Sequence, residues 1–505
     1  MSLAIVNTRA KIGIEAPPVT VEVHLSNGLP GLSIVGLPET AVKESKDRVR
    51  SALINSQFEF PARRITINLA PADIPKDGSR FDLPIAIGIL TASNQLPAKS
   101  IHGREFIGEL ALSGELRSII GILPAAIACG RQQRQLFVPT ANAEEAALSQ
   151  TTEVYGADNL LAVCAHLQNQ KQLATTIFSP PQVSVDVLDL EDVVGQILAK
   201  HALEVAAAGA HNVLFYGPPG TGKTMLATRL VGILPPLTNT QALAVATIYS
   251  LSGQAKQPWQ LPPYRTPHHT ASAVALVGGG SKPKPGEISL AHHGVLFLDE
   301  LPEFQRNVLE VLREPLESGQ ISISRASAQV KFPAQFQLIA AMNPCPCGYL
   351  TSRNPRHVCH CTADQVRRYR QKISGPLLDR IDLHVPVNNL SGADLQQLPK
   401  GETTATVRQR VLQARERQQQ RQQKTNAQLT HKDIEHYCVI GKKEKTLLNN
   451  AMEKLGLSAR AYHRILKTAR TLADLADETH IGSTHISEAI AMRNFDRKIA
   501  SKGTG

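Results

Sequence analysis

A glycine-rich loop follows a short apolar segment near the middle of the chain. Residues 212–216 read Asn-Val-Leu-Phe-Tyr, and the eight residues after them are rich in glycine and proline. Such an order of strand, loop and helix start is typical of loops whose backbone N–H groups surround nucleotide phosphates. In these loops a lysine reaches the β- and γ-phosphates, and the next hydroxyl binds Mg²⁺. The predicted triphosphate site comprises Gly217, Pro218, Pro219, Gly220, Thr221, Gly222, Lys223 and Thr224.

A second apolar segment ends in two acidic residues. Residues 295–300 read Val-Leu-Phe-Leu-Asp-Glu. At this place Asp299 supplies a carboxylate for Mg²⁺, together with Thr224, and Glu300 polarises the attacking water. The loop and the acidic pair together indicate nucleotide hydrolysis, because a fold that has lost catalysis is not expected to keep Glu300.

Length and composition limit the class of protein. A chain of 505 residues is too long for one hydrophobic core, so we expect two to four domains. The formal net charge of +11 is compatible with a polyanionic partner. The chain contains no apolar run of about twenty residues and no charged leader before an apolar core, which predicts a cytoplasmic protein that does not contact membranes. Aromatic residues make up only 4%, so base stacking is not expected to dominate any nucleic-acid binding.

The pattern of elements predicts an α/β multidomain protein. Residues 1–175 alternate short strands and helices, residues 185–390 form a β/α-alternating nucleotide domain, and residues 395–505 are almost entirely helical. A polar connection marked by prolines near residue 180 separates the first two domains. The predicted strands span 4–9, 19–25, 65–69, 106–112 and 136–138, and the predicted helices span 37–55, 83–92, 403–424, 457–476 and 483–499.

Four of the seven cysteines form two closely spaced pairs with the pattern C-x-C and C-x-C. Four thiolates can complete a tetrahedral Zn²⁺ site, and no position is left open for a catalytic water. One residue within each pair is a tighter spacing than usual, so His357 and His360 are alternative ligands. Free thiols on an exposed loop, or a redox disulfide, would also account for the pattern. The favoured prediction is a structural zinc knuckle over residues 345–361, with the ligands Cys345, Cys347, Cys359 and Cys361.

Longer motifs around the loop resemble one protein family. Residues 189–196 resemble the entry segment of AAA+ ATPases, and residues 264–270, 278–280 and 285–294 resemble their magnesium-chelatase-like branch. Over essentially its whole length the chain resembles the ComM/YifB family of competence-associated proteins. The resemblance implies an AAA+ P-loop core, an all-helical carboxy-terminal lid, and the cofactors ATP and Mg²⁺. It also implies a homohexameric ring that drives DNA branch migration when incoming DNA recombines during natural transformation.

The resemblance implies roles for three further polar residues. Asn343 ends a predicted strand and matches the sensor that helps to position the attacking water. Arg380 matches the arginine finger that one subunit supplies to its neighbour's γ-phosphate, and Arg460 matches the second sensor. Positive charge there stabilises the charge on the transferring phosphoryl group. A finger that acts in trans requires an oligomer, and a surface ion pair is the alternative for each arginine.

Two basic segments are expected to face DNA in the pore of such a ring. Residues 320–334 predict two strands with a turn near Arg325, matching a hairpin that grips DNA in related motors. There Arg325 and Lys331 would contact phosphates whatever the base sequence, in single-stranded, forked or branched DNA. The second segment, residues 266–285, is a Gly/Pro-rich loop for which a merely solvated loop is the alternative. Its candidate DNA contacts are His268, His269, Lys282 and Lys284.

The amino-terminal domain resembles the Lon protease domain, an α+β fold, but departs from its catalytic pattern. Residues 75–82 and 108–123 carry the resemblance. The nucleophile falls at Arg80, one place after Ser79, and the activating lysine falls at Leu123. Because a serine needs an adjacent base, we expect a Lon-like fold without proteolysis that acts as an assembly scaffold or a DNA-binding collar. Its basic residues include Lys43, Lys46, Arg48, Arg50, Arg63, Arg64 and Arg80.

The favoured hypothesis is therefore a ring-shaped, ATP-driven DNA motor. A chelatase-like or protein-remodelling AAA+ ATPase that does not act on DNA is the alternative, although the chain has no obvious integrin-like partner-binding domain. An ATP-dependent protease and a passive DNA-binding scaffold are less favoured hypotheses. Cleavage that Ser79→Ala abolishes would support the protease, and function that survives Glu300→Gln would support the scaffold.

Overall fold

The computed structural model describes residues 3–36, 39–180, 188–254, 257–280, 283–325, 328–350, 358–390 and 401–493. These residues form two compact units. The amino-terminal unit contains Met1–Val183 together with Asn239–Trp259 and Ser324–Phe332. The carboxy-terminal unit contains Ser184–Thr238, Gln260–Ile323 and Pro333–Gly505. The sequence pattern did not indicate that two segments from the middle of the chain group with the amino-terminal residues.

A seven-stranded sheet forms the centre of the amino-terminal unit, in the order β3-β4-β2-β1-β5-β8-β9. Strand β2 is antiparallel to both β1 and β4, and the remaining pairs are parallel. The strands are β1 (Leu3–Arg9), β2 (Pro18–Ser26), β3 (Gly31–Val35), β4 (Arg64–Ala70), β5 (Arg104–Phe106), β8 (Gln135–Pro139) and β9 (Val154–Ala157). The helices are α1 (Thr40–Lys43), α2 (Ser45–Asn55), η1 (Ser79–Phe81), α3 (Asp82–Ala92), η2 (Ala98–Ile101), α4 (Leu123–Arg131), α5 (Thr140–Ala147), α6 (Leu160–Leu167) and α9 (Asn239–Ser252).

The apolar helix predicted over residues 83–92 is present as α3, and all of its residues are buried. Helix α3 packs on β1 and β2, whose inward side chains alternate with outward ones along each strand. The contact is close at Gly88, where a Cβ atom would lie 2.6 Å from Cγ2 of Val23. A helix that is apolar on all sides is thus explained by its position in the core of this unit.

Two predicted elements are divided in the structure. The strand predicted over residues 106–112 is two strands. They are separated at Gly108, whose N–H donates to the Arg80 carbonyl and does not continue the sheet hydrogen bonds of β5. The second part, β6 (Glu109–Leu110), pairs with β7 (Leu116–Arg117). The helix predicted over residues 37–55 consists of α1 and α2 with a turn at Glu44, and residues 37–38 lie outside the described part of the chain.

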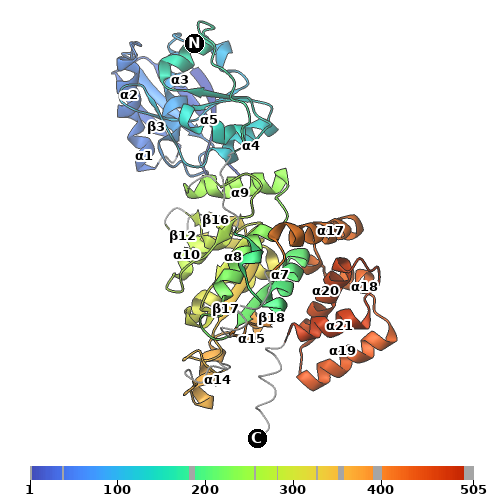
Figure 1. Ribbon diagram of the computed structural model, residues 1–505. Helices are drawn as coiled ribbons and strands as arrows, with labels where there is room; N and C mark the ends of the chain where they lie inside the picture. Colours follow the sequence, from blue (N-terminus) through green and yellow to red (C-terminus); the bar gives the residue numbers. More distant parts are fainter. Residues whose placement is uncertain are drawn as a thin grey trace. The chain divides into compact units, whose positions relative to one another are not determined.

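A five-stranded parallel sheet in the order β11-β14-β17-β10-β18 forms the centre of the carboxy-terminal unit (Figure 1). Every residue of β10, β14 and β17 is buried, as expected for parallel strands that helices cover on both faces. The strands are β11 (Tyr264–Arg265), β14 (Val295–Leu298), β17 (Gln337–Met342), β10 (Val213–Tyr216) and β18 (Leu383–Pro386). The sequence prediction of an α/β core in this part of the chain is confirmed.

Several short elements connect these strands. The helices are η3 (Leu190–Asp192), α7 (Ile197–Gly209), α8 (Lys223–Ile233), α10 (Ala273–Val277), α11 (Glu287–Leu290), η4 (Leu301–Glu303), α12 (Arg306–Glu310), α13 (Arg313–Ser318), α14 (Ala363–Gln371) and α15 (Gly375–Leu378). Two small two-stranded sheets pair β12 (Gly278–Gly279) with β13 (Lys284–Pro285), and β15 (Gln320–Arg325) with β16 (Ala328–Pro333).

The described residues after 400 are mainly helical, as predicted. The helices are α17 (Thr404–Gln422), η5 (Asn426–Gln428), α18 (His431–Tyr437), α19 (Lys442–Leu455), α20 (Ala459–Leu475) and α21 (Ser483–Ala491). The prediction for the last helix was too long, since α21 ends at Ala491 and Arg493 forms a parallel bridge with His384. The Arg493 guanidinium donates to the carbonyls of Ile381 and Asp382, which draws the chain out of the helical path. Residues 494–505 lie outside the described part.

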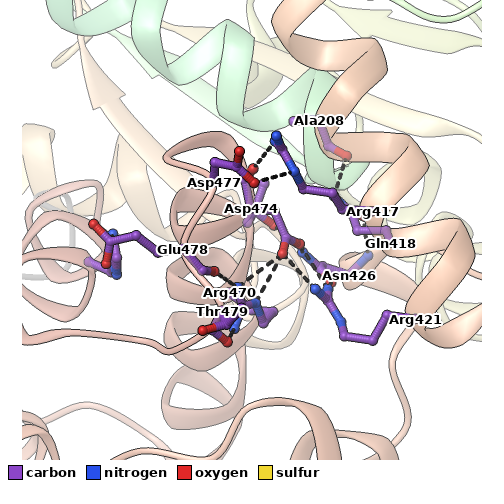
Figure 2. A network of polar contacts seen from close by, with 12 residues as sticks. Ala208, Arg417, Gln418, Arg421, Asn426, Arg470, Asp474, Asp477, Glu478 and Thr479 are labelled. Atoms are coloured by element: carbon purple, nitrogen blue, oxygen red, sulfur yellow. Dashed lines mark hydrogen bonds and ion pairs between the residues drawn. The ribbon is translucent and has the colours of Figure 1, made fainter.

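A buried polar network joins these helices to the core of the same unit (Figure 2). The Asp474 carboxylate, on α20, accepts hydrogen bonds from Arg421 of α17 at 2.6 and 2.9 Å and from Asn426 at 2.8 Å. Gln418 of α17 donates to the carbonyl of Ala208 on α7 at 3.1 Å. Since Asp474 is 1% exposed, removing one partner would leave a buried charge poorly compensated. The network therefore fixes α17 and α20 against α7.

None of the helices in the described ranges combines the length and the apolar character that crossing a membrane requires.

Candidate active site

The residues predicted to bind and hydrolyse a nucleotide meet at one edge of the parallel sheet. The glycine-rich loop follows β10, Asp299 and Glu300 follow β14, and Asn343 follows β17. Because these strands are parallel neighbours, their carboxyl ends lie together. The Thr224 hydroxyl donates to Oδ2 of Asp299 at 2.7 Å, and Nζ of Lys223 donates to Oδ1 of Asn343 at 3.2 Å.

Glycines set the path of the loop. A Cβ atom on Gly217 would overlap the carbonyl oxygen of Val387, so the close approach of the two backbones requires glycine. Gly220 and Gly222 have φ angles of 74° and 87°, a region that residues with a side chain rarely adopt. Helix α8 then begins at Lys223, which directs the unpaired N–H groups of its first turn toward the loop.

The entry segment is attached to this loop. The Gln196 side-chain amide donates to the carbonyls of Thr221 at 3.3 Å and Asn388 at 2.7 Å. Within the loop the Thr221 hydroxyl donates to the carbonyl of Pro218 at 3.0 Å. Gln196 therefore joins three separate segments at the phosphate site.

Lys223 is held in place by acceptors that a triphosphate could replace. Its side chain is mostly buried, and Nζ donates to the carbonyls of Gly217 at 2.8 Å and Pro218 at 2.7 Å. Burial lowers the pKa of Lys223 to about 8, against the opposing effect of the Asp299 and Glu300 charges. Phosphate oxygens are stronger partners for an ammonium group than neutral carbonyls, so a nucleotide would draw Lys223 away from them.

Thr224 and Glu300 are exposed beside the loop, and Asp299 is partly exposed. A hydroxyl and a carboxylate in contact suit Mg²⁺, which prefers oxygen ligands and keeps several waters. Glu300 has a φ of 52°, and its N–H donates to Oδ1 of Asp299 at 2.9 Å. Strained backbone of this kind concentrates at functional sites. Oε2 of Glu300 lies 3.4 Å from Nδ1 of His269, a neighbour that the sequence did not suggest.

The four clustered cysteines converge directly after Asn343. Sγ of Cys345 lies 3.3 Å from Sγ of Cys347 and 3.7 Å from Sγ of Cys359, and the ligand atoms of all four cysteines lie within 4.8 Å of one another. A tetrahedral site with Zn–S bonds of about 2.3 Å requires sulfur separations of about 3.8 Å, so the donor set fits Zn²⁺. Among the described residues this group consists of cysteines alone, without His360, and His357 lies outside the described part.

The cysteine knuckle packs against the phosphate loop. Gly348 has a φ of 85°, and a Cβ atom there would lie 2.8 Å from Cδ of Pro219. Arg370 of α14 supports the start of the knuckle by donating twice to the carbonyl of Pro344, at 3.2 Å each. The position of the knuckle backbone at Gly348 therefore constrains the position of Pro219 in the phosphate loop.

Arg380 lies in a pocket of about 400 Å³ whose other lining residues are Glu310, Arg313, Glu314, Glu317 and Ser318. Its side chain is 6% exposed and forms an ion pair with Glu317 of the same chain. Nη1 also donates to the carbonyl of Pro376 at 2.6 Å. In the single chain the guanidinium is thus engaged internally.

Arg460 is exposed in the first turn of α20. The Ser458 hydroxyl, which caps this helix, lies 3.5 Å from Oδ1 of Asp379, next to Arg380 in the sequence. Arg464, one turn further, forms an ion pair with the buried Asp382. The sequence prediction did not include Arg464, although its spacing of four from Arg460 on a predicted helix could have suggested a shared face.

The candidate DNA contacts are described only in part. The predicted hairpin forms as β15 and β16, with Lys331 exposed between the buried Val330 and Phe332. His268 is exposed and Lys284 is exposed on β13. The side chain of Arg325 and the whole of Lys282 lie outside what the structure describes.

The positions of the Lon-type catalytic pair hold buried side chains. Arg80 is 4% exposed and donates to the carbonyl of Ile120 at 2.8 Å, and burial lowers its pKa to about 10. Leu123 is fully buried, and the Ser79 hydroxyl donates to the Glu109 carboxylate. Two of the basic residues of this domain are engaged within it, since Arg80 is buried and Arg48 pairs with the buried Asp82 at 2.8 Å.

Three family models match successive parts of the chain. They are described as "Subunit ChlI of Mg-chelatase" over residues 21–142, "Magnesium chelatase, subunit ChlI" over residues 189–395, and "Magnesium chelatase, subunit ChlI C-terminal" over residues 401–493. Together they match parts of both units and leave residues 1–20 and 143–188 unmatched.

Similar full-length proteins are known. "Competence protein ComM" of Haemophilus influenzae is 54% identical over 505 residues, covering 98% of each chain. "Uncharacterized protein YifB" of Salmonella typhimurium is 52% identical, again over 98% of each chain. The "Magnesium-chelatase 38 kDa subunit" of Cereibacter sphaeroides is 26% identical over 171 residues, which is 30% of this chain and 51% of that protein. The chain therefore belongs to the ComM/YifB family, which has a magnesium-chelatase-like AAA+ architecture.

Proposed function

We propose that this protein is an ATPase that forms a homohexameric ring and drives branch migration of recombining DNA during natural transformation. The observation that carries the proposal is the meeting of Lys223, Thr224, Asp299 and Asn343 at the carboxyl ends of three parallel strands. A triphosphate bound there would take over the Nζ group of Lys223. Thr224 and Asp299 would hold Mg²⁺, which would neutralise charge on the phosphate oxygens.

Hydrolysis in this proposal divides between residues of two subunits. Glu300 takes a proton from the attacking water, and Asn343 orients that water. Arg380 of the neighbouring subunit stabilises the charge on the γ-phosphoryl group, and Arg460 acts as the second sensor. Because Arg380 pairs with Glu317 in the single chain, it must leave this partner before it can reach a neighbour's nucleotide.

The DNA part of the proposal rests on the family and on exposed basic groups. A relative that is 54% identical over 98% of both chains is named a competence protein. The hairpin of β15 and β16 exposes Lys331, and the net charge of the chain is +11. The proposed DNA contacts are Arg325, Lys331, His268, His269, Lys282 and Lys284.

We assign three domains to this motor. Residues 1–175 form a Lon-like domain without proteolysis, residues 185–390 form the ATPase core, and residues 395–505 form the lid. The knuckle of residues 345–361 is proposed to bind structural Zn²⁺ through its four cysteines, since their sulfur separations suit a tetrahedral site.

The test measures ATP hydrolysis and movement of a branched DNA junction by the assembled protein. We expect DNA to stimulate hydrolysis and the junction to move only while ATP is hydrolysed. Glu300→Gln should bind ATP but hydrolyse it slowly. An assembled ring that shows neither stimulation nor movement would overturn the proposal.

The trans role of Arg380 has its own test. Arg380→Ala should fold but lack turnover, and mixing it with Lys223→Ala subunits should partly restore hydrolysis, because a mixed interface can pair an intact loop with an intact arginine. Absence of any rescue in mixed rings would contradict the trans assignment.

A second candidate function is a chelatase-like or protein-remodelling ATPase. The observation that favours it is the match to magnesium-chelatase family models over both units. For this function a protein partner should raise turnover and DNA should not.

A further inference from the structure

We infer that Glu317 competes with the triphosphate of the neighbouring subunit for Arg380, and thereby sets the protein concentration at which rings assemble. This inference rests on the proposed function and adds a control of the contact between subunits. Its basis is the ion pair that Glu317 and Arg380 form in a pocket of about 400 Å³. In this pair a carboxylate of the same chain occupies the guanidinium group that a γ-phosphate would bind.

The guanidinium of Arg380 is only partly used in the single chain. Nη1 donates to the carbonyl of Pro376 at 2.6 Å, and Nη2 donates to Glu317. Nε is buried and has no hydrogen-bond acceptor among the described residues, which costs free energy. A phosphate has more acceptor oxygens than a carboxylate and can bond with more of this guanidinium than Glu317 does.

The two members of the ion pair differ in burial. The side chain of Glu317 is 55% exposed, whereas that of Arg380 is 6% exposed. A carboxylate that is more than half exposed regains water when it leaves its partner, so its departure costs little. The backbone at Arg380 is fixed, because its N–H donates to the Leu377 carbonyl at 3.0 Å and its carbonyl accepts from Asn212 at 3.0 Å. Release therefore requires only a movement of the Glu317 side chain.

The charges around the pocket make the release an exchange of anions. Among the described residues that line it, three are glutamates and two are arginines. One of the arginines, Arg313, is already paired with Glu310 at 2.7 Å. Because like charges repel, a further anion is accommodated best when the Glu317 carboxylate leaves. A terminal phosphate carries more negative charge than one carboxylate, and so it can displace Glu317.

The position of Glu317 in its helix supports this role. Glu317 lies in the last turn of α13, where the free carbonyl groups disfavour a negative charge. The ion pair with Arg380, and not the stability of α13, is thus the interaction that favours a carboxylate here. Glu314 lies in the first turn of the same helix, is exposed and lines the same pocket, but no described hydrogen bond or ion pair joins it to Arg380.

The experiment measures ring assembly of the full chain by sedimentation over a range of protein concentrations, with forked DNA and a non-hydrolysable ATP analogue. In Glu317→Ala we expect the concentration at half-maximal assembly to fall about threefold, because a partly exposed ion pair no longer competes with the triphosphate. Hydrolysis of ATP per subunit in fully assembled rings should not fall, since Arg380 remains.

Two controls make the result specific to the ion pair. Glu314→Ala removes a carboxylate from the same helix and the same pocket, and it should assemble like the unchanged protein. Glu317→Ala in a chain that also carries Arg380→Ala should have no effect on assembly, because no guanidinium is left for which Glu317 could compete.

The inference is overturned if Glu317→Ala leaves the half-assembly concentration unchanged, or if Glu314→Ala lowers it as much. It is also overturned if Glu317→Ala lowers hydrolysis per subunit in assembled rings, because Glu317 would then position Arg380 rather than withhold it. Assembly of the unchanged protein tests the proposed function separately. Rings that form, but whose assembly does not depend on Glu317, would retain the proposed function and lose this control, whereas absence of rings would remove both.

Discussion

Each unit contains a glycine with a positive φ angle just before a helix, followed closely by a basic residue. In the carboxy-terminal unit Gly222, with a φ of 87°, precedes Lys223 and helix α8. In the amino-terminal unit Gly78, with a φ of 82°, is followed by Arg80 and helix α3. The local sequences are alike, but the surroundings of the two basic groups differ.

Lys223 lies at the open carboxyl edge of a parallel sheet, beside the exposed Thr224. Arg80 is buried, and its guanidinium donates to the carbonyls of Ile120 and Gly121. A positively charged group near a glycine turn therefore forms a binding site only where the fold leaves space and access for a ligand. The comparison explains why one turn is expected to bind phosphate and the other to stabilise its unit.

The prediction with the largest expected effect concerns the different roles of Lys223 and Arg80. Lys223→Ala should weaken ATP binding by roughly 100-fold while the protein remains folded, because a charge-assisted contact to phosphate is lost. Arg80→Met should leave ATP binding unchanged and destabilise the amino-terminal unit by about 1–3 kcal/mol, because the carbonyls of Ile120 and Gly121 lose their donor. Nucleotide titration and urea unfolding of both variants check this. Weaker ATP binding in Arg80→Met would contradict the division of roles.

Substitution of Gly217 and Gly78 tests how much each turn depends on its glycine. Gly217→Ala should weaken ATP binding, by less than Lys223→Ala does, because the new Cβ overlaps the Val387 carbonyl and the loop must shift. At Gly78 the space around a new Cβ is open, so Gly78→Ala should cost only the strain of its φ angle, about 1–2 kcal/mol. The measurements are ATP-analogue affinity and thermal unfolding. Normal ATP affinity in Gly217→Ala would show that the close backbone contact does not shape the phosphate site.

Removal of the proposed zinc should affect the phosphate loop. We expect about one zinc per chain, and Cys347→Ser should lose the metal and lower ATP affinity about tenfold, since Gly348 packs against Pro219. Cys129→Ala, a change at a buried cysteine outside the knuckle, is the control and should keep the metal. Elemental analysis and nucleotide titration give the two readouts. A purified protein without zinc, yet with full ATP affinity, would show that the metal is not needed.

The smallest expected effect is a pH dependence of stability in the carboxy-terminal unit. The Glu204 and Glu488 carboxylates raise the pKa of His201 from its usual value near 6.5 to about 9. The stabilisation from this raised pKa should be fully present below about pH 6.5 and should be lost as the pH rises through about 9. Its size is limited because the His201 side chain is 36% exposed. Unfolding curves between pH 6 and 10 should differ less in His201→Gln than in the unchanged protein.

Much of the candidate site could be predicted because its signal is local. The glycine-rich loop, the acidic pair and Asn343 each follow an apolar segment, and parallel strands bring such ends together. The buried α3 was likewise predictable from its continuous apolar run, and the region after residue 400 from its predominantly helical pattern. The local sequence of these elements is enough to determine where they form.

Contacts between distant segments could not be predicted in the same way. Nothing in the order of residues indicates that His269 meets Glu300, that Glu317 meets Arg380, or that Gly348 meets Pro219. The end of α21 was misplaced for the same reason, since Arg493 leaves the helix to bond with carbonyls more than a hundred positions earlier in the chain. The grouping of Asn239–Trp259 with the amino-terminal residues is also a property of tertiary packing.

The polar network around Asp474 has a mechanical consequence. It ties α17 and α20 to α7, and α17 also packs on α8, the helix that begins at Lys223. Separating these buried charges from their partners is costly. A displacement of the first turn of α20 should therefore move α17, α20 and α7 together, rather than bend them relative to one another. In the proposed motor, the lid would then move as a rigid body when the nucleotide site changes, with little energy lost inside it.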